Sequence, residues 1–163
     1  MNAFEKEVLS VLKEDSRLSA DKIAAMLGVS TQAVTDCIRG LEGRGVLVKY
    51  TAIANEELAD SSLVEALIEV RVTPQKGEGF DGIARRIAEL PEVKGVYLMS
   101  GAYDLAIFLE GTTLQKVAQF VAERISTYDG VLSTATHFIL KKYKIEGVHT
   151  EKTALDRRQS VQP

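Results

Sequence analysis

The five residues from Ser100 to Asp104 hold the polar groups best suited to binding a small molecule. Gly101 allows a tight or left-handed turn with exposed backbone amides, and the Asp104 carboxylate can cap such amides. With the phenol of Tyr103, these groups suit the ammonium and carboxylate of an amino acid. An ordinary turn around a packed tyrosine explains the same residues equally well, and composition alone leaves both interpretations open.

Polar residues also gather on one face of the segment from Ser30 to Leu41, whose apolar residues recur at helical spacing. Threonine, glutamine and arginine can bind base edges or phosphates, whereas Asp36 would repel phosphate or pair with Arg39. DNA binding is favoured over a helical hairpin with a solvated face, because the turn, the caps and the following residues agree. The residues predicted to contact DNA are Ser30, Thr31, Gln32, Thr35, Arg39 and Lys49.

Side chains that could support catalysis or hold a metal are few and isolated. Cys37, the only cysteine, lies on the apolar stripe of the same segment, which favours a core role over redox sensing. His137 and His149 have no partners at metal-ligand spacing, and no nucleotide-binding loop or catalytic-serine motif occurs. The sequence therefore predicts a protein that is not an enzyme, with no catalytic residue, metal or cofactor.

Three predicted helices carry the candidate DNA-binding face. The first spans residues 2–14, and the second begins after Ser19, a favoured N-cap, and ends at Gly28, which tolerates a left-handed C-cap. The third is followed by a β-rich run, Val46–Ile53. A short turn with a glycine fixes two helices at a steep angle, so that the second can enter the major groove. Residues 1–54 are thus predicted to form a winged helix-turn-helix domain.

The second half of the chain alternates strands with helices. After a polar linker, residues 55–62, the order β-α-β occurs twice, which predicts a ferredoxin-like fold over residues 63–147 and makes the whole chain α+β. Both helices would then cover one face of an antiparallel sheet, and a mobile tail, residues 148–163, would follow. Strands are expected at residues 63–73, 93–99, 105–109 and 131–145, and helices at residues 80–87 and from a capping box at Thr112 and Gln115 to Ile125.

The sheet face opposite the helices is predicted to be too apolar to remain in contact with water. A second copy of the chain is the natural cover for such a face, which predicts a homodimer. The apolar residues expected on this face include Leu67, Tyr97, Met99, Phe108 and Ile139.

Composition limits the classes of function. Of 163 residues, 45% are hydrophobic and 26% charged, and the net charge of −3 argues against a nonspecific nucleic-acid coat. The first 54 residues carry seven basic and seven acidic side chains, so the predicted DNA-binding domain is neutral overall. No signal-like start and no apolar run near ~18 residues is present, so we expect a cytoplasmic protein that does not enter a membrane.

Three stretches together resemble the Lrp/AsnC (feast/famine) family of prokaryotic regulators: LSADKIAAMLGVSTQAVTDCIRGLEGRGVL, PEVKGVYLMSGAYDLAIFLEG and GVLSTATHFILKKYK. The resemblance implies dimers that assemble further into tetramers, octamers or larger rings. It also implies a small effector, often an amino acid, that binds between subunits and shifts assembly or DNA affinity. By the same resemblance, the third helix is the recognition helix, and the effector site holds Gly101, Tyr103 and Asp104 together with Thr134 and Thr136.

The leading hypothesis is therefore a sequence-specific regulator of transcription that binds double-stranded DNA and responds to an effector. Recognition helices of the family are usually more basic than this one, which has Asp36 and Cys37 where arginine is common, so assembly would have to strengthen DNA binding. One alternative is an enzyme similar to siroheme decarboxylases, for which His137 with Arg71 or Arg124 could serve. Another is an oligomeric sensor that modulates other family members without binding DNA itself.

Overall fold

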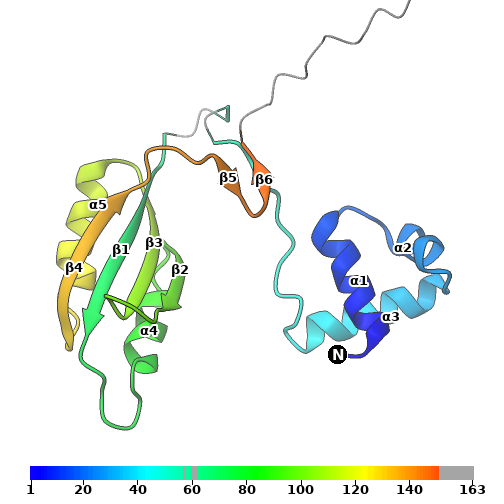
Figure 1. The fold of residues 1–163 in the computed structure, drawn as a ribbon, viewed down its shortest axis with the longest axis horizontal. Coiled ribbons are helices and arrows are strands. Elements are labelled where there is room, and N and C mark those ends of the chain that lie inside the picture. The colour runs from blue at the N-terminus through cyan, green and yellow to red at the C-terminus, as the bar shows by residue number, and fades with distance from the viewer. Residues whose placement is uncertain (57, 60–61, 151–163) are drawn as a thin grey trace, which may run out of the picture. The chain divides into compact units, whose positions relative to one another are not determined.

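The computed structural model describes residues 1–56, 58–59 and 62–150 and divides the chain into two compact units, Met1–Ile53 and Ala54–Pro163. Most of the predicted tail, residues 151–163, lies outside the described residues. No helix in the part of the chain that the structure describes is long and apolar enough to span a membrane. The first unit consists of three helices (Figure 1), which are α1 (Ala3–Glu14), α2 (Ala20–Leu27) and α3 (Thr31–Gly43).

Local capping signals set the ends of these helices. Asn2 and Glu5 form a capping box at the start of α1, and Ser30 caps α3 by accepting a hydrogen bond from the Ala33 amide at 3.2 Å. Between α2 and α3, Gly28 adopts the left-handed conformation, with φ of 68°, as its position requires. Ser19 is the N-cap of α2 but makes no side-chain cap bond.

The core of the first unit is one small apolar cluster to which all three helices contribute. Across its surface, the Arg44 guanidinium binds the Glu5 carboxylate at 2.7 Å and so ties the end of α3 to the first turn of α1. The buried members of the cluster are Val8, Leu12, Ile23, Ala24 and Val34.

The strand predicted over Val46–Ile53 is absent: none of the described residues from 44 to 63 forms a strand. Only Leu47 of this run packs on the helical core, while Val48 is 85% exposed. A strand needs a neighbour to pair with its backbone groups, and the first unit supplies none. The β propensity of these residues therefore does not produce a wing of paired strands within this unit.

The second unit is a four-stranded sheet with order β2-β3-β1-β4, in which every neighbouring pair is antiparallel. This order confirms the predicted ferredoxin-like fold and the α+β class. Along the chain its elements are β1 (Val64–Val72), α4 (Asp81–Ala88), β2 (Val93–Leu98), β3 (Leu105–Gly111), α5 (Leu114–Phe120), a π-helical turn η1 (Val121–Ile125) and β4 (Val131–Phe138).

Alternation along β1 separates a buried face from an open one. The side chains of Ala66, Ile68 and Val70 are buried in one cluster with Ile87 of α4 and Val117 of α5, so both helices cover the same face (Figure 1). The alternate residues point the other way, because successive side chains of a strand point to opposite faces. On that open face, Tyr97 is 56%, Met99 41% and Phe108 37% exposed in the single chain.

The last predicted strand is shorter than expected and is followed by a small hairpin. The strand β4 ends at Phe138, and the last bond to its neighbour is the Ile139 amide to the Glu65 carbonyl at 2.9 Å. Beyond Ile139 the backbone no longer pairs with β1, because β1 begins at Val64, so the prediction of a strand to Ile145 is wrong. Instead, β5 (Lys144–Ile145) pairs with β6 (Val148–His149), and the predicted start of the tail falls inside this hairpin.

The helix after β3 also differs in detail from its prediction. Its N-cap is Thr113, whose hydroxyl accepts from the Lys116 amide at 3.1 Å, and not Thr112. After Phe120 the helix widens into the π-helical turn η1, which no sequence pattern predicted.

Candidate functional site

Four of the predicted DNA-contacting residues lie on α3 and Ser30 is its N-cap. They differ in their exposure and in their hydrogen bonds. Thr31, Gln32 and Arg39 are exposed. Thr35 is half-buried, and its hydroxyl donates to the Thr31 carbonyl at 2.9 Å, while the Ser30 hydroxyl is engaged as the N-cap. Gln32 and Arg39 therefore carry the longest polar side chains of this face.

Asp36 lies between these two residues and binds both. The Gln32 amide nitrogen is 3.0 Å from each Asp36 carboxylate oxygen, and the Arg39 guanidinium is 3.2 Å from one of them. Exposed pairs of this kind contribute only about 0–1 kcal/mol, so they can open when a stronger partner arrives. The free helix thus holds its two longest polar side chains along its own surface.

Lys49, the sixth predicted DNA contact, lies apart from α3 along the chain, in the exposed segment that forms no strand. The neighbouring Tyr50 hydroxyl donates to Glu42 near the end of α3 at 2.9 Å, and burial raises the pKa of that phenol. No ion pair or hydrogen bond of the Lys49 side chain occurs among the described residues. The structure therefore does not bring Lys49 into the cluster formed by Gln32, Asp36 and Arg39.

The cysteine of the same helix supports the expectation of a core role. Cys37 is half-buried against the apolar cluster of the first unit. Burial raises the pKa of its thiol, with a smaller contribution from Glu5, so the reactive thiolate is disfavoured. Its environment is the opposite of the electropositive surroundings that activate a redox-sensing cysteine.

The loop predicted to bind an effector joins β2 to β3 and is fastened to β1 through Asp104. The Asp104 amide donates to the Val70 carbonyl at 3.0 Å, and its carboxylate accepts from the Val72 amide at 2.9 Å. This second bond forms where the pairing of β1 with β4 shifts register, between Arg71 and Val72. One oxygen of the carboxylate therefore has a structural role, which is to hold the loop to β1.

Thr134 and Thr136 of β4 lie nearby but differ in their distance from the loop. Thr134 pairs with Val70, the residue whose carbonyl binds the Asp104 amide, so these two predicted site residues flank one position of β1. Both threonines share the helix-covered face of the sheet, and the Thr134 hydroxyl is 3.3 Å from that of Ser126. Thr136 pairs with Ile68, two residues further from the loop.

The other two loop residues leave the site open. Tyr103 is half-buried and Gly101 is exposed, with no other atom within 4 Å of the position that a Cβ would occupy. The structure thus brings Asp104 and Thr134 to one end of the sheet, while Gly101 faces open space. The loop in one chain has polar groups that suit a ligand, and it is open to solvent at Gly101.

The residues that the enzyme alternative requires are not gathered. His137 lies on the open face of the sheet, 3.4 Å from the Glu69 carboxylate, and Arg71 shares that face. Arg124 lies on η1 in the helix layer on the other side of the sheet. Among the described residues, no group of three histidine, cysteine, aspartate or glutamate side chains could hold a metal ion.

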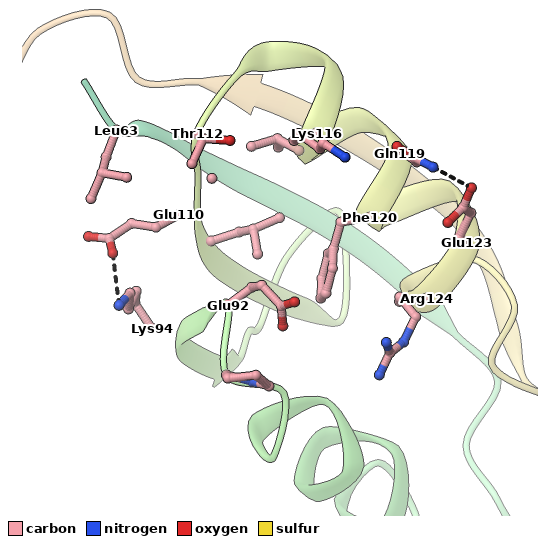
Figure 2. Close-up of a pocket in the computed structure, with 14 residues that line it drawn as sticks. Leu63, Glu92, Lys94, Glu110, Thr112, Lys116, Gln119, Phe120, Glu123 and Arg124 are labelled. Atoms are coloured by element: carbon pink, nitrogen blue, oxygen red, sulfur yellow. Dashed lines mark hydrogen bonds and ion pairs between the residues drawn. The ribbon is translucent and has the colours of Figure 1, made fainter.

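A cavity of about 620 Å³, which the sequence did not indicate, lies between the helix layer and the β2–β3 edge (Figure 2). None of the five predicted effector residues lines it. Its lining residues come from positions scattered between 63 and 124, so no compact motif could have marked them.

Comparison with known proteins agrees with both units. Residues 65–148 match the sequence profile described as "Lrp/AsnC ligand binding domain", and residues 1–48 match "Winged helix-turn-helix DNA-binding". The chain is 44% identical over 160 residues to the uncharacterized HTH-type transcriptional regulator YugG of Bacillus subtilis (strain 168), covering 98% of this chain and 96% of that protein.

Solved structures show the same fold. The leucine response regulatory protein of Mycobacterium tuberculosis matches with a TM-score of 0.75 at 22% identity, covering 93% of this chain and 100% of that one. A transcriptional regulator of Neisseria meningitidis, solved as its L-Met complex, matches with a TM-score of 0.69 at 22% identity, covering 89% of this chain and 93% of that one.

Proposed function

Because this chain belongs to the Lrp/AsnC family of transcriptional regulators, with a DNA-binding and a ligand-binding domain, we propose that a small effector, an amino acid, controls its assembly or its affinity for DNA. The matched family models and relatives are described as transcriptional regulators, so the decarboxylase alternative is set aside. The observation that carries DNA recognition is α3 itself, which follows the left-handed turn at Gly28 and exposes Thr31, Gln32 and Arg39. We expect the protein to act in the cytoplasm.

In the proposed complex, α3 lies in the major groove and its polar side chains contact base edges and phosphates. Gln32 and Arg39 leave Asp36 and bind base edges or phosphates, with Thr31 and Thr35 beside them. The backbone amides of the first turn, which Ser30 caps, face a phosphate, because a helix N-terminus favours negative charge. Lys49 adds a phosphate contact from the segment after the helix.

Assembly would compensate for the weak charge of this surface. A homodimer through the open sheet face, on which Tyr97, Met99 and Phe108 are exposed, would present two copies of α3 to one DNA. Linked sites raise overall affinity when geometry allows both to bind at once. Further association into tetramers or octamers would extend the same effect.

For the effector, we propose an amino acid bound by Gly101, Tyr103 and Asp104 with Thr134 and Thr136. Support comes from the position of Asp104 and Thr134 on either side of Val70. The half-open geometry of the loop fits a site that a second subunit completes. The related regulator of Neisseria meningitidis, which binds L-Met, gives the class of ligand a precedent.

DNA binding is tested with labelled fragments from upstream of the protein's own gene and its neighbours. We expect fluorescence anisotropy to show binding at low salt that weakens as salt rises, with a log–log slope of about −0.9 for each phosphate contact. Arg39→Gln should weaken it, whereas Arg17→Gln, an exposed arginine paired with Asp15 outside α3, should not. If no fragment binds at low salt while the protein still assembles, the sensor that lacks DNA binding becomes the function.

The effector is tested by thermal unfolding with each of the twenty amino acids. A true ligand at one hundred times its Kd stabilises the folded state by about 2.7 kcal/mol, which raises the Tm. The same amino acid should shift DNA affinity by about 5- to 150-fold. Asp104→Asn should abolish both responses, and an amino acid that raises the Tm without changing DNA affinity or assembly would contradict this regulatory role.

A further inference from the structure

The cavity between the helix layer and the β2–β3 edge has the size and shape of a ligand site. Its volume of about 620 Å³ lies within the range of about 300–1,000 Å³ that small-molecule sites occupy. It is bounded by the turn after α4, with Pro91 and Glu92, and the start of β2 on one side and by α5 and η1 on the other (Figure 2). Gly101 and Asp104 lie at the opposite end of the β2–β3 hairpin, so the two sites are separate.

The floor of the cavity is apolar and tightly built. Leu109 of β3 and Val117 of α5 are buried there, and Phe120 is half-buried beside them. The helix α5 packs closely against the end of β3 at Gly111, because a Cβ there would lie 2.7 Å from a methyl group of Val117. A ligand that reaches this floor would remove its own apolar surface from water.

The rim of the cavity carries equal numbers of opposite charges, and half of them have no partner among the residues that the structure describes. Lys94 binds Glu110 at 2.8 Å, and Gln119 donates to Glu123 at 2.8 Å. The side chains of Glu92, Lys116 and Arg124 make no ion pair or hydrogen bond within the described part of the chain. The ionisable lining residues are Glu92, Lys94, Glu110, Lys116, Glu123 and Arg124.

The π-helical turn directs one of these free charges into the cavity. Turns of this kind are rare, occur mostly as single-turn bulges and are frequent at functional sites. Figure 2 shows Phe120, the last residue of α5, and Arg124 of this turn pointing toward the side of the cavity where Glu92 lies.

We propose that this cavity is a second ligand site, specific for a zwitterion with a large apolar side chain. The Arg124 guanidinium binds the carboxylate, Glu92 binds the ammonium, and the side chain lies on Phe120, Leu109 and Val117. A lining with three acids and three bases does not favour a highly charged anion such as a nucleotide. The site is separate from the loop around Asp104, so binding at each of the two sites can be tested independently of the other.

The probe for this test is L-tryptophan, because the chain contains no tryptophan and only the probe reports in that fluorescence range. We expect its anisotropy to rise when the full-length protein is added. Tryptamine, which lacks the carboxylate, and indole-3-propionate, which lacks the ammonium, should each bind about tenfold more weakly or worse, as expected for the loss of a charge-assisted hydrogen bond. L-Phenylalanine and L-leucine serve as further probes by calorimetry.

Variants assign the binding to the cavity. Arg124→Gln and Glu92→Gln should each weaken it at least about tenfold. Matched controls are Arg85→Gln and Glu89→Gln, which remove exposed charges of the α4 region outside the cavity lining and should change affinity less than twofold. All variants alter exposed side chains, and unchanged thermal unfolding confirms that they fold.

Asp104→Asn separates this site from the proposed effector loop. Binding that survives Asp104→Asn but not Arg124→Gln supports the second site. Binding lost in Asp104→Asn and retained in Arg124→Gln, equal weakening by the control variants, or no binding of any of the three amino acids at millimolar concentration would overturn it.

Discussion

At the scale of the residue, Asp36 has the largest influence on the DNA-binding face. Its carboxylate holds Gln32 and Arg39 along α3, and it adds a negative charge beside the residues proposed to approach phosphate. The interaction of two unit charges about 4 Å apart in water is worth about 1 kcal/mol. We therefore expect the Asp36 side chain to lower DNA affinity in two ways, by repelling phosphate and by binding Gln32 and Arg39.

Replacing Asp36 by Asn should strengthen DNA binding about fivefold at low salt, because the repulsion disappears while the side-chain shape remains. Anisotropy titrations with the protein's own upstream DNA provide the measurement. Glu7→Gln, which removes an exposed carboxylate of α1, is the matched control and should have a smaller effect. An unchanged affinity in Asp36→Asn would contradict the repulsion, and a weaker one would show that the carboxylate itself takes part in recognition.

At the scale of the element, α2 and α3 both have a serine as their N-cap, but only one of the two serines makes a cap hydrogen bond. Ser30 accepts a hydrogen bond from the Ala33 amide, whereas Ser19 makes no side-chain cap bond. The first turn of α3 also holds the amides proposed to face a phosphate. We therefore expect the Ser30 cap to affect DNA binding as well as the stability of α3.

Ser30→Ala should lower the stability of α3 by about 1 kcal/mol, since the freed Ala33 amide loses its partner. Ser19→Ala should cost clearly less. Native-state hydrogen exchange of the α3 amides measures both changes in the intact chain, because it resolves stability within a structure. Equal losses in the two variants would mean that the cap bond contributes nothing measurable.

At the scale of the whole molecule, the open sheet face explains why one chain is not expected to act alone. The rings of Tyr97 and Phe108 meet edge to face, with centroids 5.7 Å apart, and both remain exposed. The helices cover only the opposite face, so this apolar surface stays in water unless another subunit covers it. Dimerisation and DNA affinity are then linked through avidity.

Phe108→Lys should convert the dimer to a monomer in size-exclusion chromatography with light scattering, because it places an unpaired charge in the proposed interface. DNA affinity should fall with it. Leu114→Lys, an exposed apolar residue at the start of α5, is the control and should remain dimeric. A dimer that persists in Phe108→Lys would place the interface elsewhere.

The sequence alone determined the features of this protein that depend on local patterns of residues. The positions of α2 and α3 follow from Ser19, Gly28 and Ser30, because caps act within a few residues of the backbone that they bind. The buried face of β1 follows from the period-two alternation of residues 64–72, which is set by strand geometry. These signals sufficed for the helix-turn-helix, the ferredoxin-like fold and the identity of the face left open.

The tertiary structure decided whatever depended on a partner distant in sequence. Residues 46–53 have the composition of a strand but no neighbour to pair with, and β4 ends where β1 no longer faces it. The Asp104 bond to Val72, and the convergence of Glu92 and Arg124 on one cavity, join residues far apart in the chain. Such contacts depend on which segments the fold places opposite each other, and no local pattern in the sequence encodes that.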